Sequence, residues 1–502
     1  MSSPCLWTKF ECADVARTLQ YLTRSKPVPI DVTVDFDSDP QALSALKSAT
    51  DRFGSLTLRL QAFELLRAFR QLESPARALE HLEVHAMPHL GDGPGFRPSI
   101  SETFFGGSTP SLKSLYLSGI NTKLNFSKFP ALTHLTLVTS VQTFNMSELF
   151  QVFTSARLLE EVSVEFNGPT SPIPEGQVVI QLPRMKSLSF SNTVEEFPKH
   201  LLSSLVTPSV EEVRLDISLP GEDTRTLQDF LPPQLQNFPH LSKVDNLKLD
   251  VPHAHCNIQF GGPGGVISIH AFRGGNRGQK DNFQSHWLES LEPMSVTDVK
   301  DLTLRGYYPE IPLGQCPVFK TLKTMDAIQS LVVERCDNAI VINTLFPAEK
   351  EVALFPRLES LAFQLISEPT TIFPSLTDMA RARSRLGLPL DKVSSDEYAT
   401  FRRSDVDSLR RHVRVVKLNT RANSPHSEPV STYSYHVVTV RILFVRGLPV
   451  GSLLISFFKD KPLLPNKTGG QIPVHSPTGG SPNGSKGSRN PLADLAAMYS
   501  RG

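Results

Sequence analysis

Apolar residues along this chain recur in one short phrase: an apolar residue, two variable residues, an apolar residue, one variable residue and another apolar residue. Twelve copies occur between residues 53 and 418, and they begin at Phe53, Leu79, Leu112, Leu132, Leu159, Met185, Val210, Val244, Val299, Ile328, Leu358 and Val413. In each copy the last two apolar residues flank a single outward residue, which is the period of a half-buried strand. Each phrase therefore predicts a β-strand with one buried face.

The spacing of the phrases indicates a repeat protein. Most steps between copies are 20–34 residues long, and two steps of 55 residues cover about two periods each. A degenerate copy, Val266-Ile269-Ala271, lies inside the first long step. One copy alone is also typical of an ordinary strand, but a dozen at related spacing is the mark of a leucine-rich repeat.

Several stretches between the phrases have helical periodicity. They are residues 61–72, 145–152, 195–205 and 282–291, and in the second of them Ser147 is a candidate N-cap. Strands that alternate with helices predict an α/β fold, namely an irregular leucine-rich-repeat solenoid or horseshoe. Its parallel sheet would line the concave face, and its helices would cover the convex face.

The chain divides into three parts by pattern. Residues 1–52 form an N-terminal segment in which Ile30, Val32 and Val34 predict one more strand. Residues 53–420 form the repeat solenoid, with insertions near 261–278, which is rich in glycine, and 367–410, which holds helix candidates near 376–386 and 404–411. Residues 421–502 form an irregular to disordered tail, because Pro, Gly, Ser, Asn and Lys dominate residues 465–489.

Composition favours a protein of the cytoplasm or nucleus. The 51 basic and 50 acidic residues nearly cancel, so no global attraction to nucleic acid or to a membrane is indicated. Five scattered cysteines suit a reducing compartment better than a disulfide framework.

The apolar stretch 437–457 is long enough to be checked as a membrane span. It contains Arg441 and Arg446, each of which costs roughly 2.5–3.5 kcal/mol in a membrane. An extra strand pair or a poorly ordered segment is therefore a better interpretation than a membrane span.

Three local features invite a chemical interpretation. His253-Ala254-His255-Cys256 offers potential zinc ligands, but a structural site needs four, usually in spaced pairs. The run Gly261–Gly265 lacks the lysine and hydroxyl residue of a phosphate-binding loop, so it predicts a turn between strands. A basic cluster could meet phosphates or an acidic partner or be a solvated helix face, and it comprises Arg402, Arg403, Arg410, Arg411, Arg414 and Lys417.

We expect no catalytic, cofactor or metal site. Ser285, His270 and His286 lie in no motif that would make them catalytic. The more informative positions are the polar residues that lie between and after the inward apolar residues of the phrases, on the open face of the sheet. The candidate partner contacts there are Glu83, His85, Tyr116, Arg214, Asp216, Arg305 and Glu334. The alternative is that strands simply need polar outer residues to stay in solution.

The ends of the repeat region resemble a family of mushroom-type fungal (basidiomycete) F-box proteins with leucine-rich repeats. The opening residues 4–10 (PCLWTKF), the stretch 21–26 (YLTRSK) with 29–32 (PIDV), and the late arginine-bearing helix with 379–385 (MARARSR) carry the resemblance. It covers about residues 4–420. In that family the F-box holds the Skp adaptor of a cullin-type (SCF) ubiquitin ligase, while the repeats select the substrate.

The resemblance implies a non-enzymatic protein-recognition solenoid, the substrate-binding part of an SCF-type receptor. The F-box itself would precede Pro4 and is missing from this sequence, so we do not expect binding of the Skp adaptor. A truncated gene, a paralogue that lost the box and a genuine repeat-only protein remain open. The alternative function is a repeat scaffold unconnected to ubiquitination.

Overall fold

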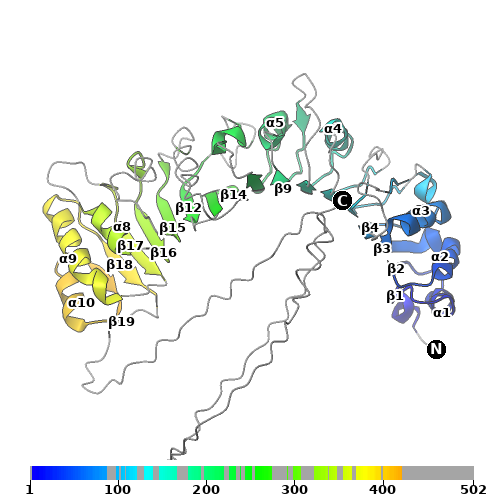
Figure 1. Cartoon of the computed structure of the whole chain (residues 1–502), viewed down its shortest axis with the longest axis horizontal. Coiled ribbons are helices and arrows are strands. Elements are labelled where there is room, and N and C mark those ends of the chain that lie inside the picture. Colours follow the sequence, from blue (N-terminus) through cyan, green and yellow to red (C-terminus); the bar gives the residue numbers. More distant parts are fainter. Residues whose placement is uncertain are drawn as a thin grey trace, which may run out of the picture. The chain divides into compact units, whose positions relative to one another are not determined.

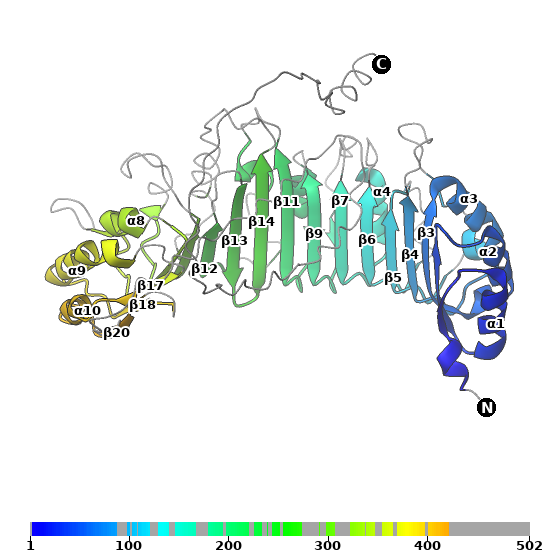
Figure 2. The same ribbon diagram turned by 60° about the horizontal axis from the view of Figure 1, so that its bottom comes forward.

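All twelve apolar phrases form strands of one sheet in the computed structural model (Figures 1 and 2). The protein is an α/β protein with interspersed helices and a large, mostly parallel sheet of 17 described strands. The chain divides into two compact units, Met1–Leu443 and Phe444–Gly502, and all described residues belong to the first. The structure describes residues 3–420 except for 88–97, 101–102, 108, 121–128, 140–145, 167–178, 194–196, 220–224, 233–237, 239–242, 251–254, 274–290, 292–297, 307–321, 337, 347–353, 365–368 and 397–399.

The first half of the sheet follows the order of the chain. Each strand pairs in parallel with the next. The strands are β1 (Lys9–Glu11), β2 (Ile30–Asp35), β3 (Phe53–Gln61), β4 (His81–Met87), β5 (Ser114–Ser118), β6 (His134–Thr139), β7 (Glu161–Phe166), β9 (Ser187–Thr193) and β11 (Glu212–Leu219). The strand predicted from Ile30, Val32 and Val34 is thus confirmed as β2.

The second half begins with strands out of chain order. Its spatial order is β14 (Gly265–Arg273), β13 (His255–Gly262), β12 (Asn246–Asp250), β15 (Asp301–Arg305), β16 (Ser330–Glu334), β17 (Ser360–Gln364), β18 (Lys392–Ser395) and β20 (Val415–Lys417). Two further parallel pairs lie outside the large sheet, β8 (Ile180–Gln181) with β10 (Leu205–Val206) and β19 (Thr400–Phe401) with β21 (Asn419–Thr420).

Two expectations about the sheet are wrong in the middle of the chain. The expected sheet is wholly parallel, but β13 is antiparallel to both of its neighbours. The degenerate copy on β14, and not the better phrase on β12, lies beside β11. The region 261–278 is therefore not simply an insertion, since β14 is a full member of the sheet.

Helices occupy many of the predicted intervals. The described helices of the α type are α1 (Val15–Ser25), α2 (Pro40–Leu46), α3 (Ala62–Gln71), α4 (Met146–Ser155), α5 (Phe197–Ser204), α8 (Asn338–Leu345), α9 (Pro369–Arg385) and α10 (Arg403–Leu409). Five of the predicted helices are confirmed as α3, α4, α5, α9 and α10. Helix α4 already includes Met146, so Ser147 lies in its first turn and the N-cap assignment is wrong. The predicted helix 282–291 lies almost entirely outside the described residues, as do the tail 421–502 and the apolar stretch 437–457.

The core is a ladder of apolar side chains in register across the strands. One rung runs through Leu58, Val84, Leu117, Leu137, Val164, Phe190, Leu215 and Ile269, each at most 1% exposed. Burial of such a side chain contributes roughly 1.5–3 kcal/mol, so the ladder is the main source of stability. Helices α3, α4 and α5 cover this side of the sheet (Figure 1), and α3 adds the buried residues Leu65 and Phe69 to the core.

A tight turn precedes most phrase strands. The amide of Leu112 donates to the carbonyl of Thr109, and the amide of Leu132 donates to that of Phe129. The same bond over three residues recurs before β4, β7, β9, β11, β16 and β17. The prolines that often precede a phrase suit this turn, because proline fixes φ and lacks a ladder donor. The turn thereby helps to set the register at the start of these strands.

Among the described residues, no helix is both long enough and apolar enough to cross a membrane.

Candidate functional site on the open face of the sheet

The polar residues of the phrases form continuous rows across the sheet. Strand alternation points them away from the apolar ladder, and parallel pairing brings equivalent positions of neighbouring strands together. One row runs through Thr57, Glu83, Tyr116 and Thr136, and the next through Asp35, Arg59, His85 and Ser118. Neighbouring members of a row lie about 4.8 Å apart along the hydrogen-bonding direction. Residues distant in sequence therefore share one surface, which we call the open face.

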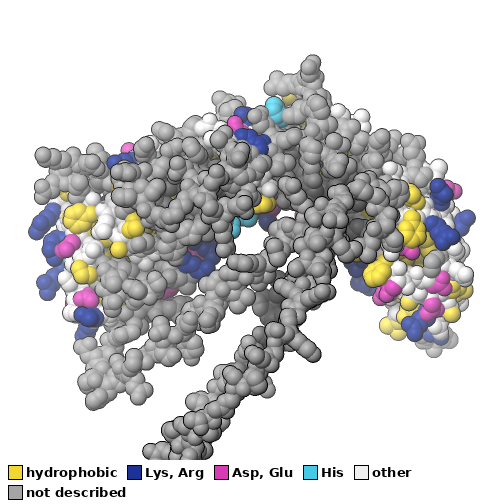
Figure 3. Space-filling view, in the orientation of Figure 1, with side chains coloured by type: hydrophobic (Ala, Val, Ile, Leu, Met, Phe, Trp, Pro, Cys, Tyr) yellow, Lys and Arg dark blue, Asp and Glu magenta, His cyan; other side chains and the backbone are white. Residues whose placement is uncertain are grey.

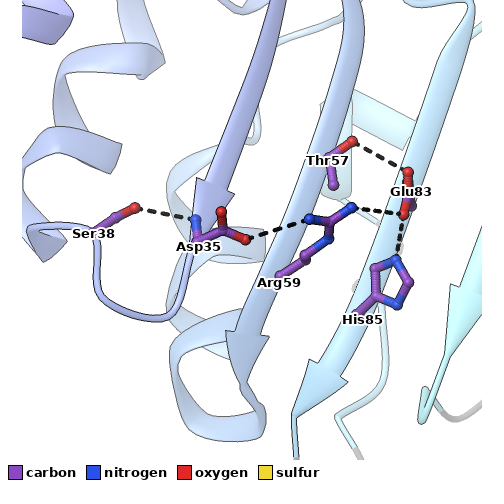
Figure 4. Close-up of polar contacts among 6 residues, drawn as sticks. All are labelled: Asp35, Ser38, Thr57, Arg59, Glu83 and His85. Atoms are coloured by element: carbon purple, nitrogen blue, oxygen red, sulfur yellow. Dashed lines mark hydrogen bonds and ion pairs between the residues drawn. The ribbon is translucent and has the colours of Figure 1, made fainter. Parts of the chain in front are cut away.

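The first polar cluster on this face is centred on Glu83 (Figure 4). Its Oε1 lies 3.5 Å from Nη2 of Arg59 and forms a hydrogen bond with Nε2 of His85, while Thr57 donates to its Oε2 over 3.4 Å. Arg59 also reaches Asp35, with 4.0 Å between Nη1 and Oδ1. Acidic, basic, acidic and imidazole groups thus alternate across β2, β3 and β4.

Two pKa shifts follow from this arrangement. Burial by itself raises the pKa of Glu83, but the hydrogen bond with His85 and the charges of His85 and Arg59 outweigh it and hold the pKa below its ordinary value. Tyr116 lies beside His85, with 4.6 Å between ring centroids. Burial raises the pKa of Tyr116, and the charges of Glu83 and Glu165 add to this rise, although a hydrogen bond with Ser118 opposes it. At neutral pH, Glu83 is an acceptor and Tyr116 a neutral phenol.

The second cluster is centred on Asp216 of β11. Arg214 lies on the same strand, with 3.2 Å between its Nε and Oδ2 of Asp216. Ser191 of β9 donates to Oδ2 over 2.9 Å, and His270 of β14 places Nδ1 3.8 Å from Oδ1. The ring of His255 on β13 lies 5.9 Å from that of His270, so this cluster spans four strands.

The third cluster is centred on Arg305 of β15. Its Nη1 lies 3.8 Å from Oδ2 of Asp250 on β12, and its Nε lies 3.5 Å from Oε1 of Glu334 on β16. The Glu334 side chain is only 16% exposed, so neighbouring strands hold its carboxylate in place. The Arg305 side chain is 32% exposed and stays accessible. Here again a cation lies between two carboxylates from flanking strands.

All seven predicted contact residues lie in these clusters, although the sequence places them at scattered positions. Glu83, His85 and Tyr116 belong to the first, Arg214 and Asp216 to the second, and Arg305 and Glu334 to the third. Sequence reasoning missed Asp35, Arg59, Ser191 and His270 as members. All four carried a usable signal: Asp35, Arg59 and Ser191 directly follow the last inward apolar residue of a phrase or predicted strand, as His85 does, and His270 directly follows Ile269 of the degenerate copy.

Stability alone gives little reason for these clusters. Solvent-exposed ion pairs contribute a median of about 0–1 kcal/mol, which is small beside the apolar ladder on the other face. What the clusters provide is a set of hydrogen-bond donors and acceptors whose positions are fixed by a rigid sheet. Such groups can orient a polar partner without much loss of side-chain entropy on binding.

The potential zinc ligands and the glycine-rich run lie on or between β13 and β14 where the structure describes them. His255 and Cys256 are neighbours on β13 and lie on opposite faces, and burial together with the charge of Asp250 raises the pKa of Cys256 to about 12. Such a thiol is a poor metal ligand at neutral pH, and no group of three potential ligands occurs within the described ranges. The predicted turn between strands is confirmed, since Pro263 and Gly264 connect β13 to β14. His253, Ser285 and His286 lie outside the described residues.

The chain matches no family model and no curated protein.

Proposed function

We propose that this chain is an irregular leucine-rich-repeat solenoid that binds other proteins through its open face and carries out no chemistry of its own. The observation that carries the proposal is the ladder of in-register phrase strands, buried on one side and lined on the other by polar clusters. Solenoids stack such units so that each repeat contacts only its neighbours, which yields an extended binding surface.

The polar clusters support a protein partner. Each has an acidic group beside a basic or imidazole group, and Tyr116 adds an aromatic ring to the first. Arginine and tyrosine are enriched among the residues that dominate protein–protein binding energy. Paired charges of both signs favour a partner with a mixed polar surface over a uniformly charged polymer.

The narrower role, substrate selection for an SCF-type ubiquitin ligase, comes from the resemblance of the N-terminal segment to fungal F-box proteins. The residues of that resemblance pack together at one edge of the sheet. Trp7 contacts Tyr21 with 5.3 Å between ring centroids, and Arg24 lies 4.3 Å from the Trp7 ring. Because this packing also suits a plain structural cap, a repeat scaffold unconnected to ubiquitination stays the alternative.

Affinity purification with charge-reversal variants tests the proposal. The open-face variant replaces Arg59, Arg214 and Arg305 by Glu, one in each cluster. The matched control replaces Arg67, Arg157 and Arg184, which are exposed and belong to none of the clusters. Mass spectrometry should recover a set of proteins with the wild type and the control that is lost with the open-face variant. Equal recovery with all three would refute the open face as the binding surface, and co-purification of a Skp adaptor and cullin would favour the ligase role over the scaffold.

A further inference from the structure

The basic cluster predicted from the sequence lies at the last edge of the sheet. Arg403 begins helix α10, Arg410 and Arg411 directly follow it, and Arg414 and Lys417 accompany the final strand β20. Helix α10 buries Val406 and Leu409, while the basic side chains are exposed. Seven residues of helix span roughly 10 Å, so the charges lie within a short distance of one another. Figure 3 shows Lys and Arg side chains gathered at the end of the sheet where α9 and α10 lie.

Only part of this charge is neutralised. Arg410 pairs with Asp407 at 3.1 Å, and Arg414 holds Asp391 in a two-pronged pair, with 2.6 Å from Nε to Oδ1 and 3.0 Å from Nη2 to Oδ2. Within the described part of the chain, no carboxylate lies within ion-pair distance of the other four basic groups. These are Arg402, Arg403, Arg411 and Lys417, which we call the basic surface.

The placement of two of these arginines costs stability. Arg402 is the N-cap of α10 and makes no capping hydrogen bond, and Arg403 follows it in the first turn. Cations at a helix N-terminus oppose the helix dipole, which Asp405 in the same turn only partly offsets, and an arginine N-cap forgoes the side-chain cap that Ser, Thr, Asp or Asn would supply. A solvated helix face would gain from the opposite arrangement, so a role in binding explains these residues better than solubility does.

The sign of the net charge changes along the chain near the basic surface. Residues before Arg381 include 32 basic and 42 acidic side chains, whereas Arg381 and the residues after it include 19 basic and eight acidic ones. The segment after Thr420 has nine basic and three acidic residues, so its net charge has the same sign as that of the basic surface. This charge distribution favours an acidic partner over the tail as the complement of the basic surface.

We infer that the basic surface binds a carboxylate-rich segment of a partner protein. Arg414 shows how an arginine of this edge takes a carboxylate, through the planar fork that matches two oxygens. Nucleic acid is less well suited, because single strands need exposed rings on which bases stack. Of the described residues 400–420, Phe401 is buried and His412 is half-buried. The inference is independent of the open face, whose clusters are already neutralised by their own partners.

Fluorescence anisotropy of the full chain with a labelled Glu/Ser peptide tests the inference. Replacing Arg402, Arg403 and Arg411 by Gln should weaken binding about tenfold, since each lost surface pair contributes a few tenths to 1 kcal/mol. The control replaces Arg67, Arg70 and Arg157 by Gln, which removes the same charge elsewhere and should leave affinity within about twofold of the wild type. Unchanged binding by the first variant would overturn the inference.

Three further arms separate other sources of binding. A tail variant with Lys459, Lys461 and Lys467 replaced by Gln must keep wild-type affinity, because an equal loss there would assign the peptide to the tail. A single-stranded oligonucleotide should bind more weakly than the peptide. If it binds more tightly, and replacing Arg402, Arg403 and Arg411 abolishes that binding, the inference is overturned in favour of nucleic acid. Self-association lost in the same variant would assign the surface to a second copy of this chain.

A charge-reversal variant distinguishes loss of direct contact from loss of binding caused by misfolding. The variant with Glu at Arg402, Arg403 and Arg411 should lose the Glu/Ser peptide and gain a Lys/Ser peptide. Failure to gain the basic peptide, in a variant whose circular dichroism matches the wild type, would count against direct contact at this surface.

Discussion

The guanidinium of Arg383 donates a hydrogen bond of 2.9 Å to the carbonyl oxygen of Phe355, which lies 28 residues earlier in the chain. Phe355 has a φ of 55°, in the left-handed region that residues with a Cβ seldom occupy. The same guanidinium donates to Leu354 over 3.1 Å, and Arg383 is fully buried. Its burial lowers the pKa of the guanidinium to about 10, so the group remains a cation at neutral pH. Arg383 thus fixes the strained turn that leads into β17.

Replacing Arg383 by Met should lower the free energy of unfolding by about 2–4 kcal/mol, because two buried carbonyl groups lose their donors. Urea unfolding followed by circular dichroism measures the loss. Arg381→Met is the matched control, since among the described residues Arg381 pairs with Asp378 at the surface, and the change should cost less than about 1 kcal/mol. Equal effects of the two changes would show that the buried hydrogen bonds do not stabilise the turn.

Gly265→Ala should destabilise the protein by about 2 kcal/mol or more. A Cβ at this position would lie 2.2 Å from the carbonyl oxygen of Glu211, which accepts a hydrogen bond from the amide of Val266, so the backbone itself must move. Gly54→Ala is the control, because its nearest heavy atom would be 3.4 Å away. Thermal unfolding should show a much lower midpoint for the first variant alone, and similar midpoints would mean that the β13–β14 turn is not closely packed on β11.

Leu215→Ala should cost about 2–5 kcal/mol, with an effect that stays local. In a stack of repeats each unit contacts only its neighbours, so hydrogen exchange should accelerate in β9, β11 and β14 and stay unchanged in β17 and β18. Mass spectrometry of exchanged peptides resolves these segments. A uniform acceleration over the whole sheet would indicate one cooperative core instead of repeats.

Glu83 should make stability depend on pH in the acid range. Its folded pKa lies below the ordinary value of 4.5, so its contribution is complete above that value and disappears as pH falls through the lowered pKa. Glu83→Gln removes the contribution, and the difference between wild type and variant should be about 0.5 kcal/mol or less at pH 7, because solvent screens the pair. Urea unfolding should show this difference vanish in strong acid, and a difference that grows there would contradict the assigned ion pairs.

The strands could be predicted from the sequence because the phrase is a local signal. Every phrase except the last places its inward pair in a strand, and in the last one β20 ends one residue before Leu418. The outward residues follow from alternation. β18 escaped prediction because its third inward position is Ser395, although Leu390 and Val393 fit. The sequence could not predict that β14, and not β12, lies beside β11. Both strands have acceptable phrases, and only long-range packing decides between them. The alternating residues on both sides of Pro263-Gly264 did, however, carry a hairpin signal.

The clusters were predictable in position and not in pairing. Glu83 and Asp216 could each be assigned to the open face from their own phrase. Their partners Arg59 and His270 come from other strands, so the pairings depend on which strands are neighbours. His270 shows the limit most clearly, because it reaches Asp216 only through the reordered β14.

Site-specific photocrosslinking is the most direct test of binding through the open face. A benzoylphenylalanine placed at Tyr116 lies on the open face beside His85, and the same residue placed at Phe63 lies exposed on helix α3, away from that face. After irradiation in cell extract, we expect discrete protein adducts from position 116 and none of these from position 63. Adducts from position 63 alone, or the same adducts from both positions, would contradict binding through the open face.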